Sequence, residues 1–161
     1  EEKHILMGLS FGGIMCIEIA KLLQVEKLIL VSSVQTHKQI PWWMRSAGLL
    51  KLNKILPIRS ASTLLEPIQD YHIGATTEEE KLIVRNYRKM VSPVYLHWSI
   101  NAILNWKNDW APPAVFHIHG NADRIFPVKN VKPDHTIKGG THFMIFTKAK
   151  EISEWLTQLL Q

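Results

Sequence analysis

Gly8-Leu9-Ser10-Phe11-Gly12-Gly13 follows the short apolar run Ile5-Leu6-Met7 and opens a segment of helical character. A G-x-S-x-G pattern between a strand and a helix is typical of a nucleophile elbow, a sharp turn that lifts a serine hydroxyl clear of a sheet. We expect Gly8 and Gly12 to flank Ser10 where a Cβ would collide across the turn. Gly13 is expected to let the helix lie close to the neighbouring strand.

Two later loops supply an acid and a base. Residues 114–119 predict a buried strand, and the loop that follows it carries Asp123; a short strand at 135–137 precedes a loop that carries His142. A serine hydroxyl needs a base to remove its proton, and a carboxylate can hold that base in the useful tautomer. The order Ser10, Asp123, His142 therefore predicts a catalytic triad.

On the motifs GLSFGG, HGNADRIFP and GGTHF, the chain resembles the α/β-hydrolase fold family, in particular its small serine esterases and lipase-like members. The resemblance covers essentially the whole chain. It implies an α/β fold with a mostly parallel sheet flanked by helices and a helical cap inserted between two strands. It also implies cleavage of a small-molecule carboxylic ester or thioester through an acyl-enzyme, with no cofactor, and the apolar residues of the cap favour an apolar acyl group. The backbone N–H of Phe11 would be one oxyanion donor.

The second oxyanion donor has no source in this sequence. In the family it comes from a loop well upstream of the elbow, and only seven residues precede Gly8 here. We therefore expect the C-terminal part of a longer fold, completed by the missing N-terminal half or by a partner chain. Residues 5–7 would otherwise form an exposed apolar edge. The activity is expected of the complete protein.

The chain divides into three segments. Residues 1–34 and 111–161 are expected to form the α/β core, and residues 35–110 the cap, where no convincing strand occurs. A capping box at Thr77–Glu80 predicts a cap helix that carries Leu82, Ile83, Tyr87 and Met90. The other expected elements are a strand at 27–31 and helices at 14–23, 41–56, 61–71, 92–104 and 148–160.

The cap is rich in tryptophan. Each tryptophan by itself is expected to hold cap helices to the core, and at least one is expected to line an apolar pocket over Ser10. The five residues are Trp42, Trp43, Trp98, Trp106 and Trp110. Residues 41–59 also combine apolar and basic side chains, which favours an ordinary cap helix over a membrane-surface helix.

Composition narrows the function classes. The 161 residues suit about one domain, and the 19 scattered Lys and Arg residues, with a net charge of +5, accompany no nucleic-acid-binding motif. Cys16, the single cysteine, is expected to be a core residue. His117 and His119 share a strand face without further ligands at metal-site spacing, so we expect no metal and a hydrogen bond from His119 near the Asp123 loop. A cytoplasmic location is expected.

Two other function classes remain open. The fold could serve as a non-catalytic binding module or be an inactive fragment, although such modules usually lose a triad residue and all three are present. The second class is a peripheral lipid-surface protein. Haloalkane dehalogenase chemistry is disfavoured because that branch has an aspartate where this chain has Ser10.

Overall fold

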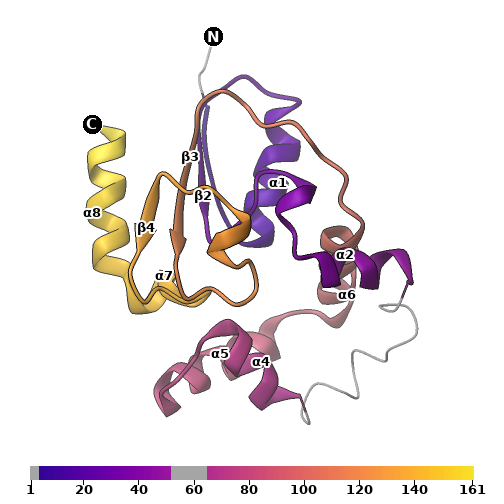
Figure 1. Ribbon diagram of the computed structural model, residues 1–161. Helices are drawn as coiled ribbons and strands as arrows, with labels where there is room; N and C mark the ends of the chain where they lie inside the picture. Colours follow the sequence, from indigo (N-terminus) through magenta and orange to yellow (C-terminus); the bar gives the residue numbers. More distant parts are fainter. Residues whose placement is uncertain (1–3, 52–64) are drawn as a thin grey trace.

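The computed structural model describes residues 4–51 and 65–161. Their strands form one parallel sheet in the order β1-β2-β3-β4 (Figure 1). The strands are β1 (His4–Leu9), β2 (Val25–Val31), β3 (Val115–Gly120) and β4 (His135–Ile137). The parallel sheet expected from the sequence is confirmed. β2 begins two residues earlier than predicted, because Val25 already pairs with His4 of β1; the register then shifts at Glu26, and Lys27 pairs with Ile5.

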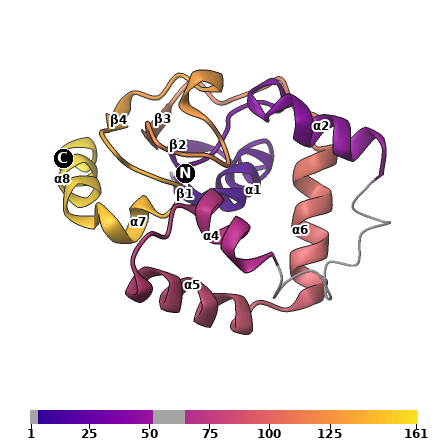
Figure 2. The same cartoon turned by 60° about the horizontal axis from the view of Figure 1, so that its bottom comes forward.

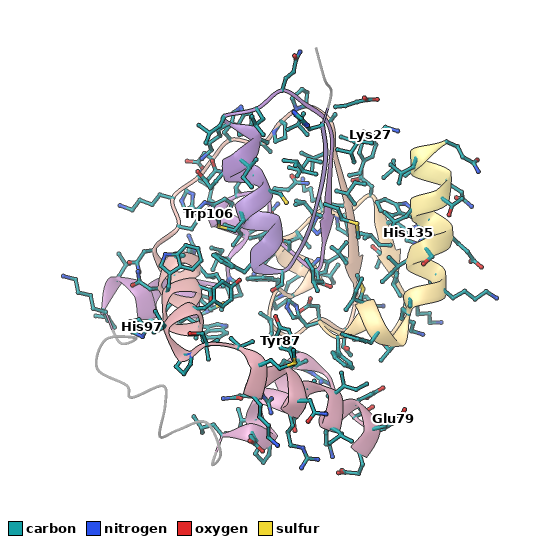
Figure 3. All side chains as sticks on the ribbon, turned by 180° about the vertical axis from the view of Figure 1, so that it is seen from behind. Lys27, Glu79, Tyr87, His97, Trp106 and His135 are labelled. Atoms are coloured by element: carbon teal, nitrogen blue, oxygen red, sulfur yellow. The ribbon has the colours of Figure 1, made fainter. Side chains whose placement is uncertain are left out.

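Helices cover both faces of this sheet (Figure 1). On one face Ile17 of α1 (Phe11–Ala20) packs with Leu28 and Leu30 of β2. On the other face Ile152 of α8 (Ala149–Leu160) packs with Val31 and other strand residues. Alternate residues of a strand point to opposite faces, which explains this division. The short helix α7 (Met144–Thr147) precedes α8. The end of α8 is joined to β2 by a hydrogen bond from Lys27 Nζ to Leu159 O at 2.7 Å (Figure 3 labels Lys27).

β1 is an open edge of the sheet. Among the described residues no strand pairs with its outer side. Ile5, Met7 and Leu9 are between 40 and 49 % exposed. The apolar edge expected from the sequence is therefore present, and its backbone N–H and C=O groups are available for another strand.

A helical segment connects β2 to β3 and lies at the carboxyl ends of the strands (Figures 1 and 2). Its described part contains no strand, as predicted. The Thr77 capping box is confirmed: Glu80 N–H donates to Thr77 Oγ1 at 3.1 Å, and Thr77 N–H donates to Glu80 Oε2 at 3.1 Å. The helices in the described part of this segment are η1 (His37–Gln39), α2 (Trp42–Leu49), α4 (Glu66–Ile73), α5 (Glu78–Met90) and α6 (Pro93–Asn105), and η2 (Val128–Asn130) follows β3.

The predicted helix α5 is present, and most of its apolar side chains lie at the surface. Leu82, Ile83, Tyr87 and Met90 are all exposed, and Val84 is the buried residue of the helix (Figure 3 labels Tyr87). Val84 packs with Ala75 and Phe143 in a small cluster. Periodicity identifies an apolar stripe but not whether another element packs on it, and here the contact is made through one side chain on a different face.

The first two predicted helices have different boundaries in the structure. The first helix starts at Phe11 and ends at Ala20, so Leu22 and Leu23 are exposed instead of buried. α2 ends at Leu49, and the rest of the predicted helix at 41–56 lies mostly outside the described residues, as does the predicted start of the next helix at 61. Part of the predicted basic face of residues 41–59 is likewise not described, so its membrane role stays a prediction. No helix of the described ranges is long and apolar enough to cross a bilayer.

Candidate active site

Ser10 occupies a strained turn between β1 and α1. Its backbone has φ 53° and ψ −120°, a left-handed conformation that a non-glycine residue rarely adopts. Ser10 N–H donates to Val31 O at 2.9 Å, and Ser10 O accepts from Gly13 N–H at 3.0 Å and from Ser33 Oγ at 2.7 Å. The surrounding hydrogen bonds therefore hold the serine in this conformation.

The glycines around Ser10 have different reasons to be glycine. A Cβ at Gly8 would lie 2.4 Å from the backbone C and O of Gly12, and a Cβ at Gly13 would lie 2.3 Å from Ser33 Oγ. A Cβ at Gly12 would meet nothing within 4 Å, so the expected collision at this position is wrong. The backbone of Gly12 is what a side chain at Gly8 would strike, whereas a side chain at Gly12 itself would point into open space.

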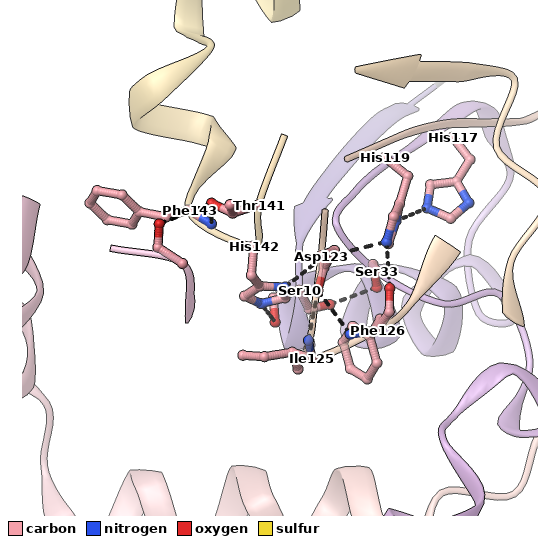
Figure 4. A network of polar contacts seen from close by, with 11 residues as sticks. Ser10, Ser33, His117, His119, Asp123, Ile125, Phe126, Thr141, His142 and Phe143 are labelled. Atoms are coloured by element: carbon pink, nitrogen blue, oxygen red, sulfur yellow. Dashed lines mark hydrogen bonds and ion pairs between the residues drawn. The ribbon is translucent and has the colours of Figure 1, made fainter. Parts of the chain in front are cut away.

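A continuous hydrogen-bond chain joins the three predicted residues (Figure 4). Ser10 Oγ lies 2.8 Å from His142 Nε2, and His142 Nδ1 lies 2.8 Å from Asp123 Oδ2. The carboxylate only accepts hydrogen bonds, so Nδ1 of His142 carries the proton and Nε2 presents its lone pair to the serine hydroxyl. The fold thus brings together residues 132 positions apart in a geometry suited to proton transfer.

Asp123 is fixed by its own loop. Its side chain is fully buried, and Oδ1 accepts the backbone N–H groups of Ile125 at 2.8 Å and Phe126 at 2.9 Å. Oδ2 is thereby turned toward His142, whose side chain is 10 % exposed. This set of donors holds the buried carboxylate in one orientation.

Phe11 combines a backbone donor with an aromatic contact. It is the first residue of α1, where backbone N–H groups have no intrahelical acceptor and the helix dipole favours negative charge. Its ring packs edge-on against Trp98 and Tyr95 of α6, at centroid distances of 5.3 and 6.5 Å. Trp98 and Tyr95 are about half exposed, so α6 places an open aromatic surface beside the residue that follows Ser10.

The other tryptophans of the inserted segment lie elsewhere. Trp106 packs in the core, and its Nε1–H donates to Glu18 Oε1 at 2.8 Å, which ties the end of α6 to α1 (Figure 3). Trp42, Trp43 and Trp110 are exposed. Trp106 therefore holds the segment to the core, as expected for a tryptophan of this part of the chain.

Helix α4 braces both loops of the site. Phe143 N–H, next to His142, donates to Ile73 O at 3.0 Å. Arg124, next to Asp123, donates from Nη1 to Tyr71 O at 2.8 Å and lies 4.1 Å from the Tyr71 ring centroid. These contacts and the Ser33 bond to the elbow were missed in the sequence. Of these contacts, only the one from Ser33 could have been predicted, because Ser33 follows β2 at the same edge of the sheet as Ser10.

Two buried histidines lie on β3 beside the acid loop. His119 Nε2 lies 2.7 Å from Phe126 O, which confirms the expected hydrogen bond near the Asp123 loop. Burial lowers the pKa of His119, and burial lowers the pKa of His117 to about 3. In the part of the chain that the structure describes, no group of three or more His, Cys, Asp or Glu side chains could hold a metal ion. Burial raises the pKa of the partly buried Cys16 thiol, as suits a packing residue.

No family model matches the sequence, and no curated protein matches it. Solved structures do resemble its fold. A meta-cleavage product hydrolase from Pseudomonas fluorescens IP01 has a TM-score of 0.65 and 16% identity, covering 99% of this chain and 65% of its own. A bromoperoxidase from Bacillus anthracis gives 0.63 and 20%, covering 97% and 66%, and a thermophilic esterase gives 0.62 and 19%, covering 98% and 66%.

These structures and this chain share the α/β-hydrolase fold. The chain spans about 65% of the length of the similar structures, so it corresponds to part of their fold. The three proteins are named for different reactions. The fold by itself therefore does not choose a reaction, and the residues of the site must do so.

Proposed function

We propose that this chain carries the catalytic residues of a serine hydrolase, which cleaves a carboxylic ester or thioester with an apolar acyl group. The observation that carries the proposal is the chain of two 2.8 Å hydrogen bonds from Ser10 through His142 to Asp123. Hydrolases and esterases among the solved structures of this fold support the same reaction class.

Each residue has one step in this reaction. Ser10 Oγ attacks the carbonyl carbon while His142 Nε2 takes its proton, and a tetrahedral oxyanion forms. His142 then gives that proton to the leaving alcohol or thiol, and the acyl group stays on Ser10. A water molecule repeats the sequence, with His142 again as base, and releases the carboxylic acid. Asp123 holds the imidazole in its tautomer and stabilises the imidazolium at both stages.

The oxyanion needs more than this chain's Phe11 N–H. Loss of one oxyanion donor typically lowers turnover by about 10²–10³. We place the second donor outside the described residues, on a segment that completes the sheet by pairing with β1. The open apolar edge at Ile5, Met7 and Leu9 supports this placement, since such an edge is rarely left exposed. The segment belongs to the remainder of the protein or to a partner chain.

The acyl preference follows from the aromatic surface beside Ser10. Phe11, Tyr95 and Trp98 contact one another, and the latter two keep about half of their surface exposed. Aromatic rings bury apolar groups favourably and do not compensate a charged one. Apolar acyl groups are therefore the expected substrates, and the helical segment would act as the cap that supplies this surface.

Labelling with a fluorescent fluorophosphonate tests the proposal. The full-length gene product is expected to label, and Ser10→Ala is expected to lose the label while keeping the thermal unfolding midpoint. Ser153→Ala is a control, because it removes an exposed serine hydroxyl on α8, away from the hydrogen-bond chain. Label that persists in Ser10→Ala would refute the nucleophile.

A non-catalytic binding module is the alternative. It retains the same three side chains but does not react with the probe. Absence of labelling in the folded full-length protein, together with no hydrolysis of p-nitrophenyl esters, would favour that alternative over the hydrolase.

A further inference from the structure

His119 lies against Asp123 on the side away from His142 (Figure 4). Its side chain is completely buried, with Nε2 2.7 Å from Phe126 O and 3.4 Å from Asp123 Oδ2. Oδ2 is the carboxylate oxygen that also accepts from His142. Asp123 therefore lies between two imidazoles, and the reaction proposed above uses only one of them.

The hydrogen bonds fix the tautomer of His119. Phe126 O can only accept, so Nε2 of His119 carries a proton, and this N–H also faces Asp123. Burial lowers the pKa of His119, which keeps the ring neutral near pH 7 and leaves Nδ1 as a lone pair. His117 Nε2, 3.0 Å away, then donates to this lone pair. The titratable groups facing His119 are thus His117, Asp123 and His142.

The peptide of Phe126 connects both sides of the carboxylate. Its N–H donates to Asp123 Oδ1 at 2.9 Å, and its carbonyl accepts from His119. A change in the His119 ring would therefore release the loop that orients the acid and remove the N–H beside Oδ2. His117 contacts His119 through its ring, and its backbone N–H donates to Asp134 Oδ2.

We propose that His119 is a positioning residue for Asp123: its neutral ring donates Nε2–H to the Phe126 carbonyl, which sets its tautomer, and so holds the loop that carries the Asp123 carboxylate. The inference rests on the proposed hydrolase function. His119 touches neither the nucleophile nor the substrate, and it acts through Asp123 on His142.

Removal of the His119 N–H is expected to shift the pH dependence of the reaction in one direction. An N–H beside a carboxylate stabilises its negative charge, so its loss leaves the carboxylate more strongly attractive to the proton on His142. The acid limb of the kcat/KM profile is then expected to move to higher pH. The hydrogen bond of His119 is the one to Phe126 O, and Asp123 Oδ2 lies 3.4 Å from the same nitrogen, so loss of the ring is expected to loosen the acid loop and to cost about tenfold in kcat.

The test compares three variants in the full-length gene product. His119→Leu removes the donor, His119→Gln keeps an amide N–H near the position of Nε2, and His117→Leu is the matched control from the same strand face with equal burial. Hydrolysis of p-nitrophenyl butyrate is measured across the acid limb, with the thermal unfolding midpoint of each variant. The downfield ¹H NMR resonance of the His142 Nδ1–H is recorded in parallel, because it needs no turnover.

His119→Leu is expected to lose about tenfold in kcat with little change in KM, to move the acid limb upward and to shift the NMR resonance. His119→Gln is expected to restore most of the rate, and His117→Leu to leave the limb and the resonance in place. Equal losses in both leucine variants, or an unmoved limb in folded His119→Leu, would overturn the inference. If His119→Leu fails to fold, His119→Asn, whose amide falls short of Phe126 O, replaces it in the same comparison.

The two proposals fail in different ways. A wild-type protein that neither labels nor hydrolyses esters refutes the proposed function. In that case the NMR resonance alone decides the role of His119: a resonance shifted by His119→Leu and not by His117→Leu supports it, and an unchanged resonance overturns it.

Discussion

Replacing Asp123 with asparagine should invert the tautomer of His142. Asp123 Oδ1 accepts two backbone N–H groups, from Ile125 and Phe126, at 2.8 and 2.9 Å. The asparagine carbonyl must stay on that side to keep both bonds. Its NH₂ group therefore faces His142 Nδ1, where only a lone pair can receive it, so the proton moves to Nε2 and the ring can no longer accept from Ser10.

The structure also sets how strongly the asparagine amide prefers the unproductive orientation, with its NH₂ group toward His142. Turning the amide around would place NH₂ against two buried N–H groups, at a cost of about 1–3 kcal/mol for each lost hydrogen bond. The sum, about 2–6 kcal/mol, favours the unproductive orientation by roughly 30-fold to 10⁴-fold. The same replacement in another serine hydrolase lowers kcat about 10⁴-fold. We expect a loss of about 10³–10⁴ in kcat here.

The assay is p-nitrophenyl butyrate hydrolysis and the rate of fluorophosphonate labelling, both measured in the full-length gene product. Asp134→Asn is the matched control, because Asp134 Oδ2 accepts His117 N–H at 2.7 Å and an amide oxygen can do the same. It removes one negative charge close by and should retain near wild-type activity. An Asp123→Asn enzyme within tenfold of wild type, with an unchanged unfolding midpoint, would show that Asp123 is not the orienting acid.

Three further predictions follow from the same structure. His142→Ala should reduce kcat nearly as much as Ser10→Ala, because the residues act as a unit; substantial surviving ester hydrolysis would place the base elsewhere. Gly8→Ala should cost about 3 kcal/mol or more in thermal unfolding, since its Cβ would lie 2.4 Å from Gly12 backbone. Gly12→Ala, whose Cβ meets nothing, should not, and equal midpoints for the two variants would contradict the packing. His117 has a folded-state pKa of about 3, below its ordinary 6.5, so it contributes stability above pH 6.5 that is lost as the pH falls toward 3. The loss is on the order of 4 kcal/mol at pH 3, and His117→Leu should flatten the slope of unfolding free energy against pH over this range; an unchanged slope would refute the assignment.

The sequence by itself determined the local features of this protein. The glycine-flanked Ser10, the loop positions of Asp123 and His142, the capping box at Thr77 and the strand-helix-strand order are all readable, because each depends on neighbours within a few residues.

Only the tertiary structure decided the distances and the surroundings. One 2.8 Å bond of the site joins Ser10 to His142, 132 positions away, and the other joins His142 to Asp123, 19 positions away. Their lengths depend on the register of β1 to β4. The exposure of the α5 apolar residues and the open space at Gly12 could not be read from spacing. The placement of His119 against Asp123 is of the same kind, because packing between distant elements sets which groups meet in three dimensions.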